Sequence, residues 1–377
     1  MLLDEHRLYL SDLTRLSLFR RAISAVVKPG DVVLDLACGT GVLGLLAMKA
    51  GAAKVYQVDH SGMIQIARDV ACANGYGQKV IGIHEASSRA TLPEKADVVV
   101  ADQLSVFGIG AGMPEIFNDA RRRLLKPGAR AIPRRIEVFS VPVNFPEMWR
   151  MASFWDKRHA GLTMSPARSI AFNTDYPSER SPRRILARPA QMFTFDLTDV
   201  APERSTATAA IEVSAVGVMH GLSVWFAAEL APGVMMTNSP VSKSRMQRPA
   251  AFLPVGKPLA LNKGDRLDIT MSAITTQRLL SWKVVVFDSR GKEKARSVHS
   301  TLKGMSLVPE ELAKTRPDFV PRLSEWGAAR RSVVNLADGN RTLAEIETEI
   351  FRTHPFLFPS LAEASEYIAR VLLPDTN

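Results

Sequence analysis

The feature that most constrains the fold of this chain is a glycine turn between a short apolar strand and a helix. Residues 32–36 read Val-Val-Leu-Asp-Leu, a run typical of a buried strand, and residues 42–50 are apolar and favour a helix. The segment between them carries Gly39 and Gly41. A strand, a glycine turn and a helix in this order form the first unit of a parallel α/β sheet.

The rest of the first 133 residues repeats this alternation of strand and helix. Three further apolar runs predict strands at residues 54–59, 80–83 and 96–101, with helical segments between them. A helix is also predicted at residues 15–27, ahead of the first strand. Short loops and right-handed crossovers then give a doubly wound, Rossmann-like sheet over residues 1–133.

After Pro133 the pattern changes to alternating apolar and polar residues, which predicts antiparallel strands. We expect a β-barrel or sandwich over residues 134–305. A stretch rich in Pro, Arg and Ser, at about 149–188, interrupts it as a helical or looped excursion. The predicted strands are residues 135–141, 192–197, 209–218, 222–227, 266–271 and 282–287.

The last part of the chain, residues 310–377, is predicted to be a small, mainly helical domain. Thr342 is a candidate helix N-cap with Glu345 three residues later, the spacing of a capping box. A second amphipathic helix is predicted at residues 360–373.

Composition narrows the function classes. With 48 Lys and Arg against 38 Asp and Glu, the formal net charge is +10, which favours anionic partners. The basic residues are scattered without aromatic residues between them, which argues against a nucleic-acid groove. No apolar run is long enough to span a membrane, and the N-terminus is not a signal peptide. The cysteines Cys38 and Cys72 make neither a disulfide framework nor a metal site, so we expect a cytoplasmic protein without a metal.

The glycine turn is a candidate cofactor site. A Gly-x-Gly spelling serves several nucleotides, and Gly39, Gly41 and Gly44 together also fit the dinucleotide pattern. Asp59, at the end of the second predicted strand, lies about twenty residues downstream, where a carboxylate can accept both ribose hydroxyls of a nucleoside. Asp35 lies just before the turn.

Longer motifs resemble one family. The run from Val33 to Gly41, with residues 50–59, resembles the S-adenosylmethionine (AdoMet) site of class I methyltransferases. Between His6 and Phe287 the chain is similar to the protein arginine methyltransferases. The motifs that carry this are Leu10-x-Asp12-x-x-Arg15-x-x-x-Phe19-x-x-Ala22-Ile23, Leu92-Pro93-Glu94, Leu125-Lys126-Pro127-Gly128, Ile132-Pro133, Phe154-Trp155-Asp156 and Met164-Ser165.

The resemblance implies a Rossmann-like domain, a β-barrel, a dimerisation arm at about 149–188, a homodimer, and AdoMet as the cofactor. It also implies a role for each matching residue. Arg15 would pair with the methionine carboxylate of AdoMet, for which a guanidinium offers a fork of donors. The other residues implied in cofactor binding are His6 in the same pocket, Asp35, Gly39 and Gly41 at the turn, Asp59 on the ribose, and Ser87 or Ser88 near the adenine.

The chain departs from the family where the family holds the substrate guanidinium between two glutamates. A gapless comparison places Asp102 at the first of these positions and Ala111 at the second. Glu115 could replace the second only if the glycine-rich loop 103–114 were rebuilt. The family's Thr-His-Trp loop has no counterpart in residues 244–248. Asp102 is therefore the candidate catalytic residue, placed to orient an acceptor or take its proton.

Two hypotheses follow for the whole chain. The first is an AdoMet-dependent methyltransferase that methylates a peptide or a small biosynthetic intermediate, most readily at nitrogen, and not a protein arginine. The second is a non-catalytic scaffold or partner subunit that retains the fold. The intact glycine turn and Arg15 favour the enzyme, and Ala111 favours the scaffold.

Residues 332–346 resemble the small winged-helix domains that hold precursor peptides in ribosomal natural-product pathways. The resemblance implies that a leader peptide could add a strand to the edge of the wing. The alternative is an appended helical cap or a dimer contact.

Overall fold

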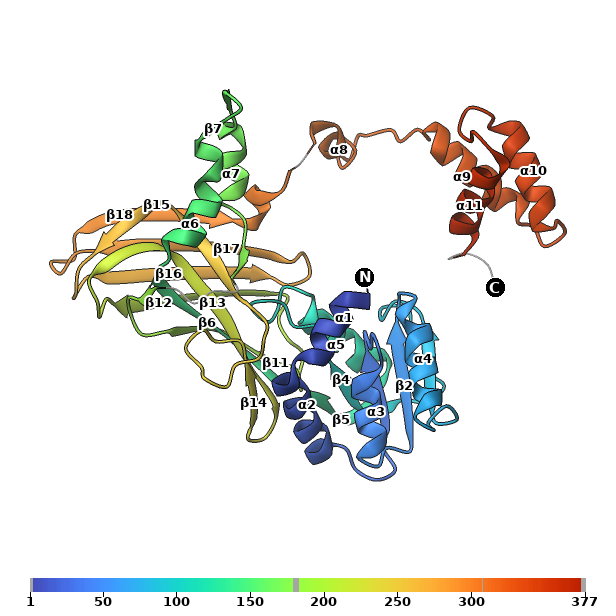
Figure 1. Cartoon of the computed structure of the whole chain (residues 1–377), viewed down its shortest axis with the longest axis horizontal. Coiled ribbons are helices and arrows are strands. Elements are labelled where there is room, and N and C mark those ends of the chain that lie inside the picture. The colour runs from blue at the N-terminus through green and yellow to red at the C-terminus, as the bar shows by residue number, and fades with distance from the viewer. Residues whose placement is uncertain (1–2, 179–182, 307, 374–377) are drawn as a thin grey trace. The chain divides into compact units, whose positions relative to one another are not determined.

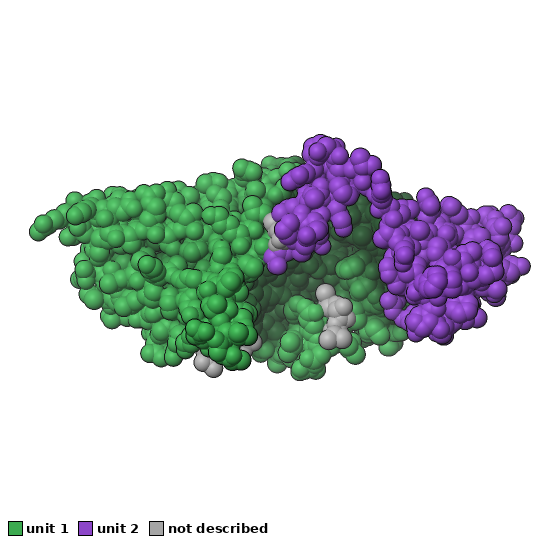
Figure 2. Space-filling view, turned by 90° about the horizontal axis from the view of Figure 1, so that it is seen from above, with its two compact units in different colours: residues 1–305 green, residues 306–377 purple. Residues whose placement is uncertain are grey.

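The computed structural model describes residues 3–178, 183–306 and 308–373. The chain divides into two compact units, residues 1–305 and 306–377, which are coloured separately in Figure 2. Among the described residues no helix has the length and apolar character needed to cross a membrane.

The first half of unit 1 is a five-stranded parallel sheet with the order β3-β2-β1-β4-β5 (Figure 1). Strands β1 (Val32–Leu36), β2 (Lys54–Asp59) and β4 (Ala96–Ala101) have the predicted bounds, and β3 is Val80–His84. The last strand, β5, is Leu125–Ile132. The helices are α1 (Leu3–Ser11), α2 (Leu13–Val26), α3 (Val42–Lys49), α4 (Met63–Ala73) and α5 (Met113–Arg123). The predicted Rossmann-like sheet is confirmed.

The second half of unit 1 is antiparallel. One sheet has the order β10-β6-β13-β15-β9, with β11 also paired to β6 and β14 to β13. The other has the order β12-β16-β17-β18. The bounds are β6 (Arg135–Asn144), β9 (Tyr176–Ser178), β10 (Arg184–Ile185), β11 (Ala190–Asp196), β12 (Arg204–Glu212), β13 (Gly217–Ala231), β14 (Val234–Thr237), β15 (Ala250–Leu261), β16 (Arg266–Ile274), β17 (Leu279–Phe287) and β18 (Glu293–Ser300).

Two details of the predicted β region need correction. The expected single strand at 209–218 is split between β12 and β13, because the intervening residues bond elsewhere: Val213 N donates to Asp265 O and Ser214 N to Leu186 O. The described strands pair into two sheets, and a closed barrel is not confirmed.

The excursion between β6 and β11 projects from the antiparallel region in Figure 1. It contains α6 (Pro146–Ala152), η1 (Ser153–Asp156), the short hairpin β7 (Arg158–His159) and β8 (Leu162–Thr163), η2 (Ser165–Ala167) and α7 (Arg168–Ala171). Phe154, Trp155 and Leu162 are exposed there. Part of the excursion, residues 179–182, lies outside the described residues.

The parallel and antiparallel parts of unit 1 share one hydrophobic core. Phe19, Phe117 and Phe226 come from α2, α5 and β13, and all three are fully buried in it. Because α2 also packs against β13 and β14, its N-terminal turn is held beside both parts of the unit.

Unit 2 is helical, with α8 (Pro309–Ala313), α9 (Glu325–Leu336), α10 (Leu343–Thr353) and α11 (Leu361–Leu372). Thr342 and Glu345 form the predicted capping box of α10. The last three helices bury a small core around Val333, Ile350 and Ile368. Residues 308–373 contain no strand, so the winged-helix resemblance is not confirmed.

Candidate active site

The glycine turn joins the carboxyl end of β1 to α3, beside the ends of β2 and β4. Gly39 and Gly41 have φ of 53° and 75°, in the left-handed region that favours glycine. A Cβ on Gly39 would lie 2.6 Å from the His6 ring, and one on Gly41 would lie 2.3 Å from the Gln57 amide. Both positions therefore need glycine for conformation and for space.

Two buried aspartates hold this turn. The Asp59 carboxylate accepts hydrogen bonds from Gly39 N at 2.9 Å and from the Ser61 hydroxyl at 2.7 Å. The Asp35 carboxylate accepts one from Gly44 N at 2.8 Å, and burial raises the pKa of Asp35 to about 7. The backbone N–H groups of the turn are thus fixed by side chains of β1 and β2.

A cavity of about 230 Å³ opens beside the turn. It brings together six of the predicted residues, namely His6, Arg15, Asp35, Gly39, Asp59 and Asp102, and Ala111 also lines it. Gly41, the remaining predicted residue of the turn, caps α3 just outside this lining. His6 is buried, and its Nε2 atom has no hydrogen-bond partner among the described residues.

Arg15 lies in the first turn of α2, where sequence explains both its position and its burial. Asp12 caps the helix by accepting from Arg15 N at 3.0 Å, an interaction that typically contributes about 1 kcal/mol. Arg15 shares the buried face of α2 with Phe19, Ala22 and Ile23. The guanidinium therefore points inward, where its Nη1 donates to Tyr9 O at 3.3 Å.

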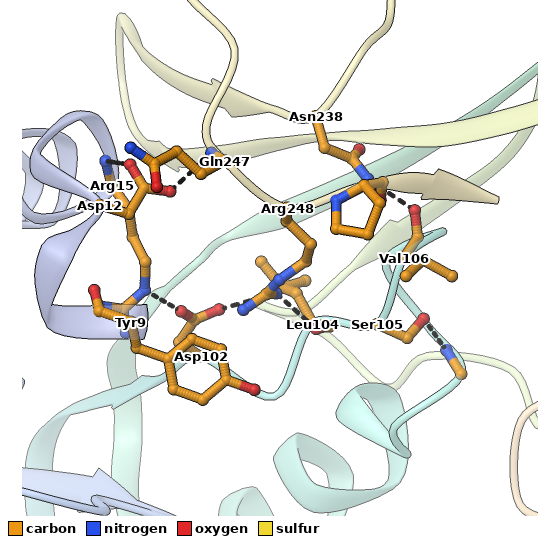
Figure 3. Close-up of polar contacts among 12 residues, drawn as sticks. Tyr9, Asp12, Arg15, Asp102, Leu104, Ser105, Val106, Asn238, Gln247 and Arg248 are labelled. Carbon is orange, nitrogen blue, oxygen red and sulfur yellow. Dashed lines mark hydrogen bonds and ion pairs between the residues drawn. The ribbon is translucent and has the colours of Figure 1, made fainter. Parts of the chain in front are cut away.

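A second cavity, of about 520 Å³, adjoins the first and shares Tyr9, Arg15 and Leu104 with it. Figure 3 shows how it is built from three segments that are far apart in the sequence. They are the α1–α2 region, the loop after β4, and the loop between β14 and β15. We call these two cavities the cofactor cavity and the acceptor cavity.

Asp102 lines the cofactor cavity and is nearly buried, with 6% of its side chain exposed. One carboxylate oxygen forms an ion pair with Arg15 Nε. The other lies 3.3 Å from Arg248 Nη1, which also donates to the Leu104 carbonyl. The candidate catalytic carboxylate is thus engaged by two guanidinium groups.

The other predicted residues lie elsewhere. Ser87 and Ser88 line a third cavity, with Glu115, Asn118 and Asp119, and are not brought together with the glycine turn. Glu115 lines neither of the cavities that Arg15 lines. The loop is thus not rebuilt to bring Glu115 to Asp102, and Ala111 lines the cofactor cavity. Among the described residues no group of three His, Cys, Asp or Glu side chains could hold a metal ion.

Two family profiles match this chain in succession. Residues 12–131 match the ribosomal protein L11 methyltransferase (PrmA) profile, and residues 134–285 match the arginine methyltransferase oligomerization subdomain. An arginine N(omega)-methyltransferase of Streptomyces achromogenes is 26% identical over 71% of this chain and 75% of its own. A probable protein arginine N-methyltransferase 6 of Arabidopsis thaliana is 28% identical over 59% of this chain and 54% of its own.

This chain is similar to the PRMT-like AdoMet-dependent methyltransferases. It spans about half the length of the Arabidopsis relative.

Solved structures share the PRMT-like fold. A Trypanosoma brucei PRMT1 enzyme-prozyme heterotetrameric complex with AdoHcy gives a TM-score of 0.70 at 23% identity, over 78% of this chain and 97% of the other. Arabidopsis thaliana protein arginine methyltransferase 10 gives 0.69 at 19% identity, over 80% and 98%.

Sequence reasoning missed Arg248, whose guanidinium contacts the candidate catalytic carboxylate. It lies in a loop without a recognisable motif, and only the tertiary structure brings it to Asp102. Asn238 was also missed. This buried amide donates to the Val106 and Pro249 carbonyls, at 2.7 Å each, and so ties the loop of Arg248 to the loop of Asp102.

Proposed function

We propose that this chain transfers a methyl group from AdoMet to a peptide or a small biosynthetic intermediate, at an atom outside an arginine guanidinium. One observation carries the proposal. Both oxygens of Asp102 are engaged by Arg15 and Arg248. Ala111, which the gapless comparison of sequences puts at the family's second glutamate position, lines the cofactor cavity. Neither oxygen of Asp102 is therefore left free to receive a substrate guanidinium.

The cofactor cavity fits AdoMet in its chemistry. Asp59 offers a carboxylate for ribose hydroxyls, and the unpartnered His6 nitrogen is a buried polar atom that a polar ligand would satisfy. Arg15, which contacts Asp102 through Nε and the Tyr9 carbonyl through Nη1, would bind the methionine carboxylate. AdoMet supplies an electrophilic methyl group on a sulfonium, which leaves the protein to position the acceptor and exclude water.

Asp102 has a positioning role in this proposal. With both oxygens held, it fixes Arg15 towards the cofactor cavity and Arg248 towards the acceptor cavity. To take a proton from an acceptor, Asp102 would have to release Arg248 first. A neutral amine or imidazole nitrogen, which must lose a proton only after transfer, suits this arrangement best.

A substrate guanidinium would meet two resident ones. At an effective dielectric constant of about 20, two like charges about 4 Å apart repel by roughly 4 kcal/mol. That repulsion would have to be offset by carboxylates that are already engaged.

Methylation of arginine is the second candidate, because the matching relatives are named arginine methyltransferases. A non-catalytic partner subunit is the third, because the trypanosomal neighbour is a complex of an enzyme with a prozyme.

The test has two stages. Calorimetry with AdoMet and AdoHcy should give micromolar dissociation constants, and no heat with either would reject the cofactor assignment. Mass spectrometry after incubation with AdoMet should then show no dimethylarginine in histone or Gly-Arg-rich peptides. Dimethylarginine would favour the second candidate. Methylation of a candidate substrate encoded beside the protein would favour the first, and cofactor binding without transfer to any acceptor would favour the third.

We also propose a homodimer formed through the excursion at about 149–188. Its exposed apolar side chains Phe154, Trp155 and Leu162 are what an isologous contact would bury. Sedimentation should give a dimer at tens of micromolar, and Phe154→Ser with Leu162→Ser should shift it to monomer. A monomeric wild type, or a dimer indifferent to both changes, would contradict this.

Leader-peptide binding by unit 2 stays a prediction, as do the cytoplasmic location and the adenine role of Ser87 or Ser88. Because residues 308–373 have no strand, a leader would have to dock against helices. Removing residues 306–377 should leave AdoHcy binding intact and raise the Michaelis constant for a long precursor but not for a short core peptide. Equal losses on both would indicate a structural cap.

A further inference from the structure

Arg248 presents a charged group to the acceptor cavity that the proposed methyl transfer does not by itself explain. The residue lines this cavity with Tyr9, Asp12 and Arg15, and 10% of its side chain is exposed. Its guanidinium carbon lies 5.6 Å from the centre of the Tyr9 ring. A buried guanidinium at the wall of a substrate cavity is a candidate specificity residue.

The loop that carries Arg248 is anchored on both sides of this residue. Gln247 N donates to Asp12 Oδ2 at 2.7 Å, and the Pro249 carbonyl accepts from Asn238 Nδ2 at 2.7 Å. Arg248 Nη1 itself donates to the Leu104 carbonyl. The guanidinium is therefore held in place before any ligand arrives, so binding need not order it.

In and beside the acceptor cavity, the carboxylates already have protein partners, whereas the Arg248 guanidinium has donors without one among the described residues. Both oxygens of Asp12 are occupied, by Arg15 N and Gln247 N, and both oxygens of Asp102 by the two arginines. Arg248, in contrast, uses only Nη1. Within the described part of the chain its Nε and Nη2 have no protein partner and are not sealed from solvent.

The acceptor cavity thus offers donors and positive charge. The carboxylates of Asp12 in its wall and of Asp102 in the adjoining cavity are already engaged by protein donors. A ligand group that complements it supplies acceptors and negative charge in a plane, as a carboxylate does towards a guanidinium fork. A guanidinium or ammonium group supplies only donors and would compete with Arg248 for Asp102.

We infer that Arg248 binds a carboxylate of the methyl acceptor, so that the acceptor is an amino acid, a peptide with a carboxylate near the methylated atom, or another carboxylic acid. The inference rests on the proposed function, which names no such group. It makes Arg248 the residue that selects the acceptor, through the Nε and Nη2 donors that the protein leaves open.

The experiment uses the full chain saturated with AdoHcy. Ligand-observed NMR would measure binding of the common L-amino acids and, as matched probes, their C-terminal amides. We expect a subset of the acids to bind at least tenfold more tightly than their amides. Arg248→Gln should remove this preference, and Arg248→Lys, which keeps the charge and loses the fork, should retain part of it.

Lys243→Gln is the matched control, because it removes one positive charge from the same loop at an exposed residue that lines neither cavity. It should change acid binding less than twofold. AdoHcy affinity and circular dichroism of each variant establish that the fold and the cofactor cavity persist.

Three outcomes would overturn the inference while AdoHcy still binds. They are the absence of any acid preferred over its amide, a preference that survives Arg248→Gln, and displacement of every acid by inorganic phosphate at a lower concentration, which would indicate a phosphate site. Loss of AdoHcy binding by the wild type would reject the proposed function instead.

Discussion

The cofactor cavity and the acceptor cavity adjoin each other, yet the chain builds them in different ways. Half of the residues that line the cofactor cavity come from one continuous β-turn-α-β stretch, between Asp35 and His60. The acceptor cavity takes residues from three segments, around Tyr9, Leu104 and Arg248. A site made by one local motif keeps its chemistry as long as the motif persists, whereas a site made by distant loops can change its chemistry through one residue.

The carboxylates in and around the two cavities also differ in the groups that they bind. The carboxylates of the cofactor cavity, Asp35 and Asp59, fix backbone N–H groups of the glycine turn. Asp12, in the wall of the acceptor cavity, accepts from the backbone N–H groups of Arg15 and Gln247. Asp102, in the wall of the cofactor cavity, forms ion pairs with the Arg15 and Arg248 side chains. Arg15 is the charged residue among the three that the two cavities share, so its removal provides the most severe test of the comparison.

We expect Arg15→Ala to have the largest effect. The change leaves the buried Asp102 without its Arg15 partner and the Tyr9 carbonyl without a donor. Breaking a buried ion pair from one side typically costs about 3–5 kcal/mol in unfolding free energy. Urea denaturation should show a loss of this size, and calorimetry should show weaker AdoHcy binding.

Arg21→Ala, at an exposed position of the same helix, is the control and should change the unfolding free energy by less than about 0.5 kcal/mol. A similar small change for Arg15→Ala would mean that the two cavities are independent of this ion pair.

Asp59→Ala should have the next largest effect, and only on the cofactor side. It removes the acceptor for Gly39 N and the proposed partner of the ribose hydroxyls, which should weaken AdoHcy binding by about 1–3 kcal/mol. Calorimetry would measure this, with the exposed Asp69→Ala as a control of equal charge. An unchanged AdoHcy dissociation constant would remove Asp59 from the site.

The difference between the cavities also explains what sequence reasoning could reach. Local apolar runs predict the strands β1, β2 and β4. Two closely spaced glycines, which have positive φ in the structure, predict the turn. The capping box of α10 is equally local. These features were predicted with the correct bounds.

What was not predicted depends on contacts between distant segments. The break between β12 and β13 exists because Val213 and Ser214 bond to residues far along the chain. Arg248 reaches Asp102 across 146 positions of sequence, and no motif near Arg248 indicates that approach. Nothing in the alternation of residues distinguishes a closed barrel from two open sheets.

The smallest expected effect concerns Asp35 and depends on pH. Burial, together with the nearby Asp59 charge, raises the pKa of Asp35 to about 7 against the opposing effects of the Gly44 N–H and Arg15. An unfolded aspartate has a pKa of about 3.9. Between these two values the folded protein retains a proton that the unfolded chain releases, so this group makes the folded state less stable as pH rises from about 4 to about 7.

Asp35→Asn removes this ionisation and retains an oxygen that can accept from Gly44 N. The unfolding free energy of the variant relative to the wild type should therefore increase with pH from about 4 to about 7 and stay constant above that range. Urea denaturation at several pH values would measure it, with Asp69→Asn at an exposed position as the matched control. A flat difference for Asp35→Asn would mean that the Arg15 charge, which links the two cavities, keeps Asp35 ionised throughout.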